Sequence, residues 1–288
     1  MENTIDVIKS SLKDGVKLID TGTRYHNQEI VGEAVKQALK DGIIKREDLC
    51  IVGKVWLQDR IEPEKALKYT LNCFGIDYID IYLDHWPYGK DYRKEEVIRA
   101  AADPFTPISI YEFWPKMESL VDKGLAKSIG VSNYNVQALC NLLSFCRIRP
   151  VVNEVEFNPF YYQKNLKEFC DKENIAIIAY TPLVNGIVAR TYNAGHNDEF
   201  NPFKEQIIID MAKKYIKTEG QIILNWEHSL GVIPIPATSK TWRMKENLAA
   251  LDFKMKDEDY KALNNQFLYG RKKKFVVGNK YFGVNVLG

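Results

Sequence analysis

The sequence has few of the features that would place a protein in a membrane, in an oxidising compartment or on nucleic acid. No stretch approaches the roughly 18 consecutive apolar residues of a membrane-spanning helix, and the N-terminal MENTIDVIKSSLKDG lacks the apolar region of a signal peptide. The net charge is only +2, which suggests neither a nucleic-acid partner nor a membrane surface. An odd number of cysteines without a Cys-x-x-Cys pair predicts reduced core thiols in a cytoplasmic protein. The cysteines are Cys50, Cys73, Cys140, Cys146 and Cys170.

Motifs of several common catalytic and binding sites are also absent. No Gly-x-Gly-x-x-Gly follows a predicted strand, so there is no Rossmann fingerprint. Gly53-Lys54 is followed by Val55 rather than Ser or Thr, so this is not a P-loop. There is no Gly-x-Ser-x-Gly nucleophile elbow, and the four histidines show no metal-ligand spacing. We therefore expect no metal site.

Apolar, β-rich runs alternate with amphipathic helical patterns along the chain. The expected strands are residues 17–20, 49–55, 78–86, 126–132, 151–157, 175–183 and 231–237. The expected helices are residues 31–42, 62–73, 110–122, 136–146, 163–172, 203–215 and 221–228. This alternation predicts parallel strands with right-handed crossovers in a single α/β domain, residues 1–288. About seven strands suit an open doubly wound sheet, whereas a closed barrel needs eight.

Polar residues stand at the carboxyl ends of several of these runs. They are Asp20, Lys54, His85, Ser132 with Asn133, and Glu154. In a barrel such ends converge on one mouth, whereas in an open sheet they spread along an edge. Taken alone, Asp20 suits a cap and Tyr25 an ordinary surface or core position. A lysine inside an apolar strand, such as Lys54, is costly to bury, and the joint pattern therefore favours a proton-handling site in a barrel mouth.

Four of these side chains have the chemistry to protonate an oxygen. A free phenol titrates near 10, and an ammonium beside Tyr25, supplied by Lys54, would lower that pKa. A buried lysine tends to lose its proton, and Asp20 would keep it charged. His85 can orient a substrate carbonyl by a hydrogen bond. Together they can protonate an oxygen as a hydride arrives at its carbon.

The motifs around these residues resemble those of the aldo-keto reductases over nearly the whole chain. GVKLIDTGTRYHNQEIVG resembles the first family signature, with Asp20 and Tyr25 at the catalytic Asp and Tyr. IVGKVW and YLDHWP supply Lys54 and His85 at the catalytic Lys and His, and Trp86 follows in the substrate pocket. GLAKSIGVSN and ATSKTWRMKEN resemble the second and third signatures. The resemblance implies a TIM-type (β/α)8 barrel that reduces aldehydes or ketones.

The same resemblance implies a set of cofactor-binding residues. Ser132 and Asn133 would hold the nicotinamide carboxamide, and Glu154 stands where the family commonly has a Gln with that role. Tyr180 would stack on the nicotinamide ring, and Thr181, Leu183 and the residues to Gly186 would line the pyrophosphate.

At the other end of the cofactor, Thr238 and Arg243 would face the adenosine 2′-phosphate, and Glu246 and Asn247 the adenine. A guanidinium forms paired charged hydrogen bonds with phosphate, which favours NADPH over NADH. The family's usual Lys in this signature is Ala237 here, and we hypothesise that Lys240 compensates. Residues 88–107 and the tail from Phe267 are expected to shape the substrate pocket with Trp86.

One family element is missing from the pattern. The N-terminal hairpin and first barrel strand are not seen, because the sequence starts at what resembles the first helix. A monomer is expected unless this gap drives dimerisation, since unpaired strand edges invite association. The main prediction is an NADPH-dependent reductase. The alternatives are a cofactor-binding or scaffold relative that no longer turns over and a Schiff-base aldolase using Lys54 as nucleophile.

Overall fold

The computed structural model describes residues 3–87, 108–184 and 200–276 of the chain. The chain divides into two compact units, Met1–Asn153 and Glu154–Val277, each described here by itself. The expectation that these residues form a single domain stays a prediction.

Four parallel strands form the centre of the first unit. They are β1 (Leu18–Asp20), β2 (Cys50–Val55), β3 (Ile79–Asp84) and β4 (Ala126–Ser132). Each strand pairs in parallel with the next along the chain. Lys54 lies opposite Leu83, and Asp84 lies between Val55 and Val131, so the carboxyl ends of β2, β3 and β4 are in register. This register brings the polar residues that follow these strands to one edge.

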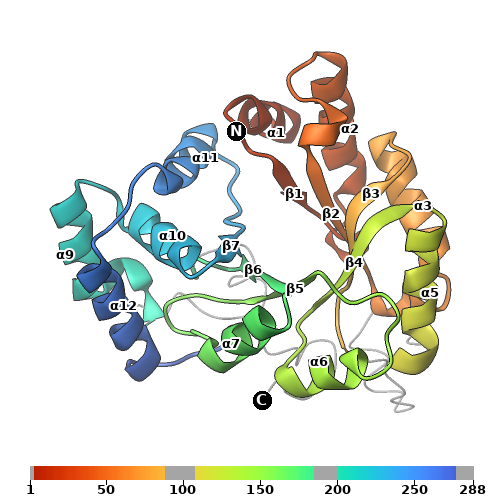
Figure 1. Ribbon diagram of the computed structural model, residues 1–288. Coiled ribbons are helices and arrows are strands. Elements are labelled where there is room, and N and C mark those ends of the chain that lie inside the picture. Colours follow the sequence, from red (N-terminus) through yellow and green to blue (C-terminus); the bar gives the residue numbers. More distant parts are fainter. Residues whose placement is uncertain (1–2, 88–107, 185–199, 277–288) are drawn as a thin grey trace, which may run out of the picture. The chain divides into compact units, whose positions relative to one another are not determined.

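Helices cover the first unit's strands, as a parallel sheet requires. They are α1 (Thr4–Lys13), α2 (Gln28–Lys40), α3 (Pro63–Phe74), α5 (Ile110–Asp122) and α6 (Val136–Leu143), with 3₁₀ turns η1 (Thr23–Tyr25), η2 (Arg46–Asp48) and η3 (Leu57–Ile61). Figure 1 shows α2, α3 and α5 along the same face of the strands. Helix α3 begins with Pro63 in its first turn and is followed directly by Gly75, which adopts a left-handed φ of 61°. Proline at the start and glycine just past the end are the residues that those positions favour.

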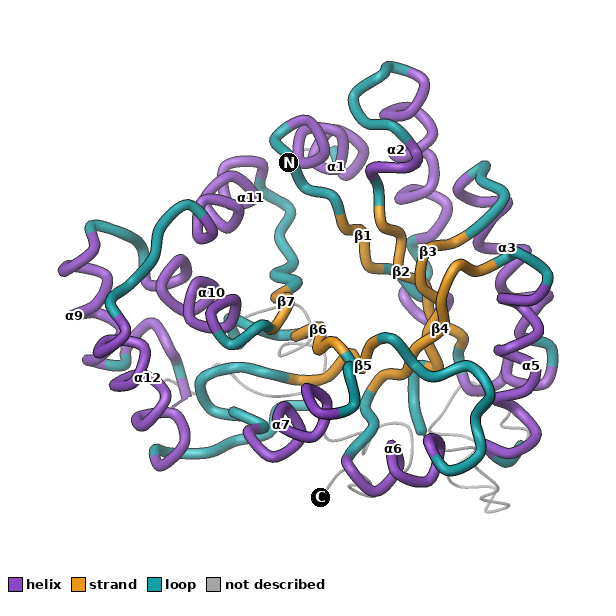
Figure 2. The backbone as a smooth tube through the Cα atoms, viewed as in Figure 1, coloured by secondary structure: helices purple, strands orange, loops and turns teal. Residues whose placement is uncertain are grey.

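The second unit contains the remaining described elements. The strands are β5 (Val152–Glu156), which begins just before the boundary of the unit, β6 (Ala176–Tyr180) and β7 (Val232–Pro234). The helices are α7 (Lys164–Lys172), α9 (Gln206–Tyr215), α10 (Glu219–Ser229), α11 (Thr241–Leu248) and α12 (Asp257–Tyr269), with turns η5 (Pro202–Lys204) and η6 (Ala249–Leu251). Figure 2 shows α10 between β7 and the helices α9 and α12. Accordingly, every residue from Gly220 to Glu227 is buried.

The predicted alternation of elements is confirmed, and β6 and β7 also pair in parallel. The five cysteines are all free, as expected, but the description of them as core thiols was wrong for most. Only Cys170 is buried, and Cys140 is exposed on the outer side of α6, where the amphipathic pattern of the helix does not require an apolar residue. Across the described segments, no helix is both long and apolar enough to cross a membrane.

Candidate active site

Lys54 and Asp20 form a buried ion pair at the ends of β2 and β1. The Lys54 side chain is fully buried, and its Nζ donates to Asp20 Oδ1 and to the carbonyl oxygen of Thr21, the latter at 3.2 Å. A charged amine is stable in a buried position only where a counter-charge and hydrogen bonds replace its water. The pairing expected from the isolated lysine in an apolar strand is therefore present.

Tyr25 lies over this ion pair on the short turn η1. Lys54 Nζ is 5.0 Å from the centroid of the Tyr25 ring, and 43% of the Tyr25 residue surface is exposed. Gly22, just before the turn, permits this approach. A Cβ atom there would lie 3.3 Å from Lys54 Cβ and 3.5 Å from the Tyr25 ring. The phenol is thus held beside a buried cation while part of it remains open to solvent or a ligand.

His85 follows β3 and completes the group. Its ring contacts Tyr25 edge to face at a centroid distance of 5.6 Å and Trp56 at 5.0 Å. Burial, reinforced by the Lys54 ammonium, holds the pKa of His85 well below its usual value near 6.5. The imidazole is therefore neutral at physiological pH and offers one N–H donor and one acceptor nitrogen. A neutral imidazole can orient a carbonyl oxygen without adding a second buried charge beside Lys54.

Ser132 and Asn133 lie immediately next to His85. Both are buried at the end of β4, and Asn133 adopts a left-handed φ of 63°. Asn133 Nδ2 donates to the main-chain oxygen of His85 at 3.0 Å and to Ser132 Oγ at 3.2 Å. The first unit therefore brings together six of the residues singled out from the sequence. They are Asp20, Tyr25, Lys54, His85, Ser132 and Asn133.

The candidate cofactor residues at the ends of β5 and β6 belong to the second unit. Glu154 is fully buried within β5, and Tyr180 ends β6 half-buried. Thr181 then adopts a left-handed φ of 50°, and its buried hydroxyl has no hydrogen-bond partner among the described residues. Leu183 is half-buried in the following turn. A buried hydroxyl without a partner next to a strand end fits a position where a phosphate oxygen is bound, because such groups otherwise carry a desolvation cost.

The other predicted cofactor residues surround α11. The Arg243 side chain is exposed, and its guanidinium lies 5.0 Å from the centre of the Trp242 ring. Thr238 Oγ1 accepts from the Lys240 amide at 3.2 Å. Glu246 Oε1 accepts from the Thr218 hydroxyl at 3.1 Å, and Asn247 is half-buried. Arg243 forms no ion pair within the segments that the structure covers, so its charge is available to a phosphate.

The predicted substrate-pocket residues are only partly covered. Trp86 is 2% exposed and follows His85 directly. Phe267 and Phe275 are buried in the second unit, where Phe267 packs on Trp226 at 4.7 Å. Gly186, residues 88–107 and the tail from residue 277 lie outside the described residues.

Sequence reasoning missed a second buried polar group in the first unit. Arg60, Asp84 and Tyr134 are buried, and Arg60 and Tyr134 each contact the Asp84 carboxylate, which directly precedes His85. The signal available in the sequence was Asp84 itself, an acidic residue inside the apolar strand YIDIYLDHW. The same reasoning that singled out Lys54 would have required a partner for Asp84.

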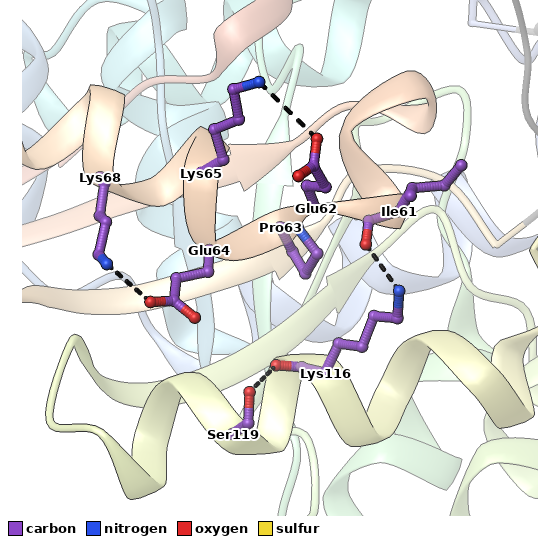
Figure 3. A pocket seen from close by; sticks show the side chains of 8 residues that line it. All are labelled: Ile61, Glu62, Pro63, Glu64, Lys65, Lys68, Lys116 and Ser119. Carbon is purple, nitrogen blue, oxygen red and sulfur yellow. Dashed lines mark hydrogen bonds and ion pairs between the residues drawn. The ribbon is translucent and has the colours of Figure 1, made fainter.

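A separate surface groove lies between the start of α3 and α5 (Figure 3). Its lysines are held by groups in the groove wall, such as Lys68 by Glu64 at 2.8 Å and Lys116 by the carbonyl oxygen of Ile61 at 2.6 Å. The cationic side chains therefore have partners within the protein.

Comparison with known proteins connects this arrangement to a family. The sequence pattern of the Aldo/keto reductase family matches residues 1–266. The chain is 35% identical over 272 residues to aldose reductase C of Dictyostelium discoideum, covering 90% of this chain and 80% of that one. It is 36% identical over 280 residues to an NAD(P)H-dependent D-xylose reductase of Pyricularia oryzae, covering 92% and 86%. An aldo-keto reductase of Bombyx mori in complex with NADP superposes with a TM-score of 0.83 at 30% identity, covering 100% of this chain and 91% of that one.

The parallel strands and these similarities place the chain among the α/β-barrel oxidoreductases. The chain belongs to the aldo/keto reductase family. The predicted (β/α)8 barrel type is thereby confirmed, and the described residues supply seven of its strands. The prediction of an NADPH-dependent reductase of aldehydes and ketones is also confirmed. Neither a scaffold without turnover nor an aldolase is favoured.

Proposed function

We propose that Tyr25 donates the proton to the substrate oxygen during carbonyl reduction by this chain. The observation that carries the proposal is the fully buried Lys54 ammonium, which lies between the Asp20 carboxylate and the Tyr25 ring. The bound reduced nicotinamide supplies a hydride to the carbonyl carbon. Lys54 stabilises the phenolate that Tyr25 becomes, and Asp20 keeps Lys54 charged. Neutral His85 donates a hydrogen bond that orients the carbonyl oxygen next to Tyr25.

The residues proposed to hold the cofactor are those whose side chains suit its separate parts. Asn133 and Ser132 present an amide and a hydroxyl for the carboxamide, and Glu154 accepts from its NH₂. Tyr180 stacks on the ring, and Leu183 and the Thr181 hydroxyl, which has no hydrogen-bond partner among the described residues, face the pyrophosphate. The remaining contacts are to the adenosine half. They come from Thr238 and Arg243 to the 2′-phosphate and from Glu246 and Asn247 to the adenine.

We further propose that the substrates are aldehydes of sugar size, with Trp86 in the wall of their pocket. The relatives whose names include aldose and D-xylose support this substrate class. A monomer acting in the cytoplasm is the proposed working form, and the five free cysteines are consistent with a reducing compartment.

The test is NADPH oxidation, followed at 340 nm, with D-xylose, other aldoses and simple aldehydes. Tyr25→Phe is expected to lower kcat about 100-fold or more, because general acid catalysis contributes about that much. Tyr111→Phe is the matched control, since that tyrosine lies on α5 and is 55% exposed, and it should retain full activity. NADPH binding without turnover of any carbonyl compound would refute the reductase assignment. Full activity of Tyr25→Phe would refute the role proposed for Tyr25 but leave the reductase assignment in place.

A further inference from the structure

A buried polar group lies directly behind the candidate active site. Asp84 is the last residue of β3 and is fully buried. Its Oδ2 accepts from the Tyr134 hydroxyl at 2.7 Å, and the Arg60 guanidinium approaches the same oxygen at 3.5 Å. Arg60 comes from η3 and packs over the Phe113 ring at 4.2 Å. Three elements far apart in sequence thus place a carboxylate, a guanidinium and a phenol together in the core.

Burying charged groups of this kind carries a desolvation cost that offsets much of the stability that their pairing contributes. Burial raises the pKa of Asp84, while Arg60, the Tyr134 hydroxyl and the main-chain N–H of Trp86 act against that shift and favour the carboxylate. Buried ion pairs often contribute no more to stability than apolar residues of the same volume. Arg60 also retains buried nitrogens without a hydrogen-bond partner among the described residues. The arrangement is therefore better explained by the positions that it fixes.

Two turns of the candidate site meet at this group. Asp84 ends β3 and directly precedes His85, so contacts that hold the Asp84 side chain also restrict the main chain at the start of the turn after β3. Tyr134 follows Asn133, and its main chain is held on both sides by the Asn153 amide, which accepts from the Tyr134 N–H at 3.4 Å and donates to its carbonyl oxygen at 2.8 Å. The Asp84–Tyr134 hydrogen bond links these two turns.

A second link confirms that the turns are set against each other. The Asn133 amide donates to the His85 carbonyl oxygen at 3.0 Å. The Asn133–His85 bond joins the two turns through the His85 main chain, and the Tyr134–Asp84 bond joins them through the buried carboxylate. Two turns joined by two hydrogen bonds can move less relative to each other than two turns joined by one.

We propose that Asp84 is a positioning residue, which uses Tyr134 and Arg60 to hold the His85 imidazole and the Asn133 amide in one fixed relation. The inference rests on the proposed roles of His85 and Asn133, because it assigns no contact with substrate to Asp84 itself. Removing the Asp84–Tyr134 hydrogen bond would leave the Asn133–His85 hydrogen bond as the remaining one of these two links, so the relation between the turns would be less tightly fixed.

The test uses Tyr134→Phe, which removes one hydroxyl and conserves the volume of the ring. The matched control is Tyr82→Phe on β3, whose buried hydroxyl has no hydrogen-bond partner among the described residues. We expect kcat to fall about tenfold in Tyr134→Phe and to stay within about twofold of wild type in Tyr82→Phe. The ¹⁵N signals of the His85 imidazole should shift in the first variant alone.

The imidazole signal separates this inference from the proposed function. If wild type shows no turnover, the reductase mechanism fails, but an altered His85 signal in Tyr134→Phe still supports the positioning role. If Tyr134→Phe is too unstable to study, the double variant R60M/D84N removes both buried charges together and should give the same shift. Wild-type kcat and an unchanged His85 signal in a folded Tyr134→Phe or R60M/D84N protein would overturn the inference.

Discussion

Replacing Glu227 by glutamine is expected to stabilise the protein by an amount that grows as the pH rises. Glu227 lies on α10 and is fully buried, and neither of its carboxyl oxygens has a hydrogen-bond partner among the described residues. Burial raises the pKa of this carboxyl well above its usual value near 4.5. The folded protein therefore keeps Glu227 protonated at pH values where the unfolded chain has released that proton.

The sign and size of the effect follow from this difference in proton binding. Below pH 4.5 both states carry the proton, and Glu227 has no effect on the pH dependence. Above it only the folded state does, so stability falls by about 1.4 kcal/mol per pH unit until the folded pKa is reached. Glutamine has nearly the shape of the neutral acid but does not titrate. The advantage of Glu227→Gln over wild type should therefore increase with that slope.

The measurement is the free energy of unfolding in urea at pH 5, 6, 7 and 8 for wild type, Glu227→Gln and Glu258→Gln. Glu258 is the control because its side chain is 71% exposed in the same unit. The low pKa of His85 affects all three proteins alike and cancels in the differences. A stability difference between Glu227→Gln and wild type that is constant from pH 5 to 8 would refute the reasoning. So would the same slope in Glu258→Gln.

Three further predictions address the candidate site residues and the segment at Phe275 in the second unit. Asp20→Asn should lower kcat about 10- to 100-fold, because Lys54 loses its counter-charge; unchanged steady-state kinetics would contradict this. Arg243→Ala should raise the KM for NADPH about tenfold and leave that for NADH unchanged, so an unaltered NADPH/NADH ratio rules out the phosphate contact. Glu156 accepts the Phe275 amide at 2.9 Å, and Glu156→Gln should speed hydrogen exchange of that amide about tenfold; equal rates by NMR would show that the carboxylate does not hold this segment.

The strands were predictable because each one is a nearly continuous apolar run. Residues buried beneath helices leave that pattern whatever the details of their packing. The ends were less predictable. The run 175–183 continues in apolar and β-favouring residues, yet β6 ends at Tyr180 because Thr181 adopts a left-handed backbone. A backbone conformation that depends on surrounding residues cannot be predicted from the pattern of apolar residues in the sequence.

Helix α12 shows a different limit. Its buried positions are Asp259, Leu263 and Phe267, spaced four residues apart, but the first of them is an acid. The Asp259 carboxylate is held by Lys214 at 2.8 Å and by the Tyr215 hydroxyl, both from α9. A helix whose inner face includes a charged residue has no clear amphipathic pattern until its partners are known. For this reason α12 was not predicted.

The same distinction separates the two buried ion pairs of the first unit. Lys54 could be interpreted from sequence because one charge in an apolar strand demands a partner, and Asp20 stood at the end of the neighbouring strand. Asp84 raised the same demand, but its partners lie on η3 and after β4, where Arg60 and Tyr134 each have an ordinary local explanation. A sequence can therefore indicate that a buried charge is paired. Which residues pair with it depends on how the strands are ordered in space, and that order fixes the position of the groups that meet the substrate.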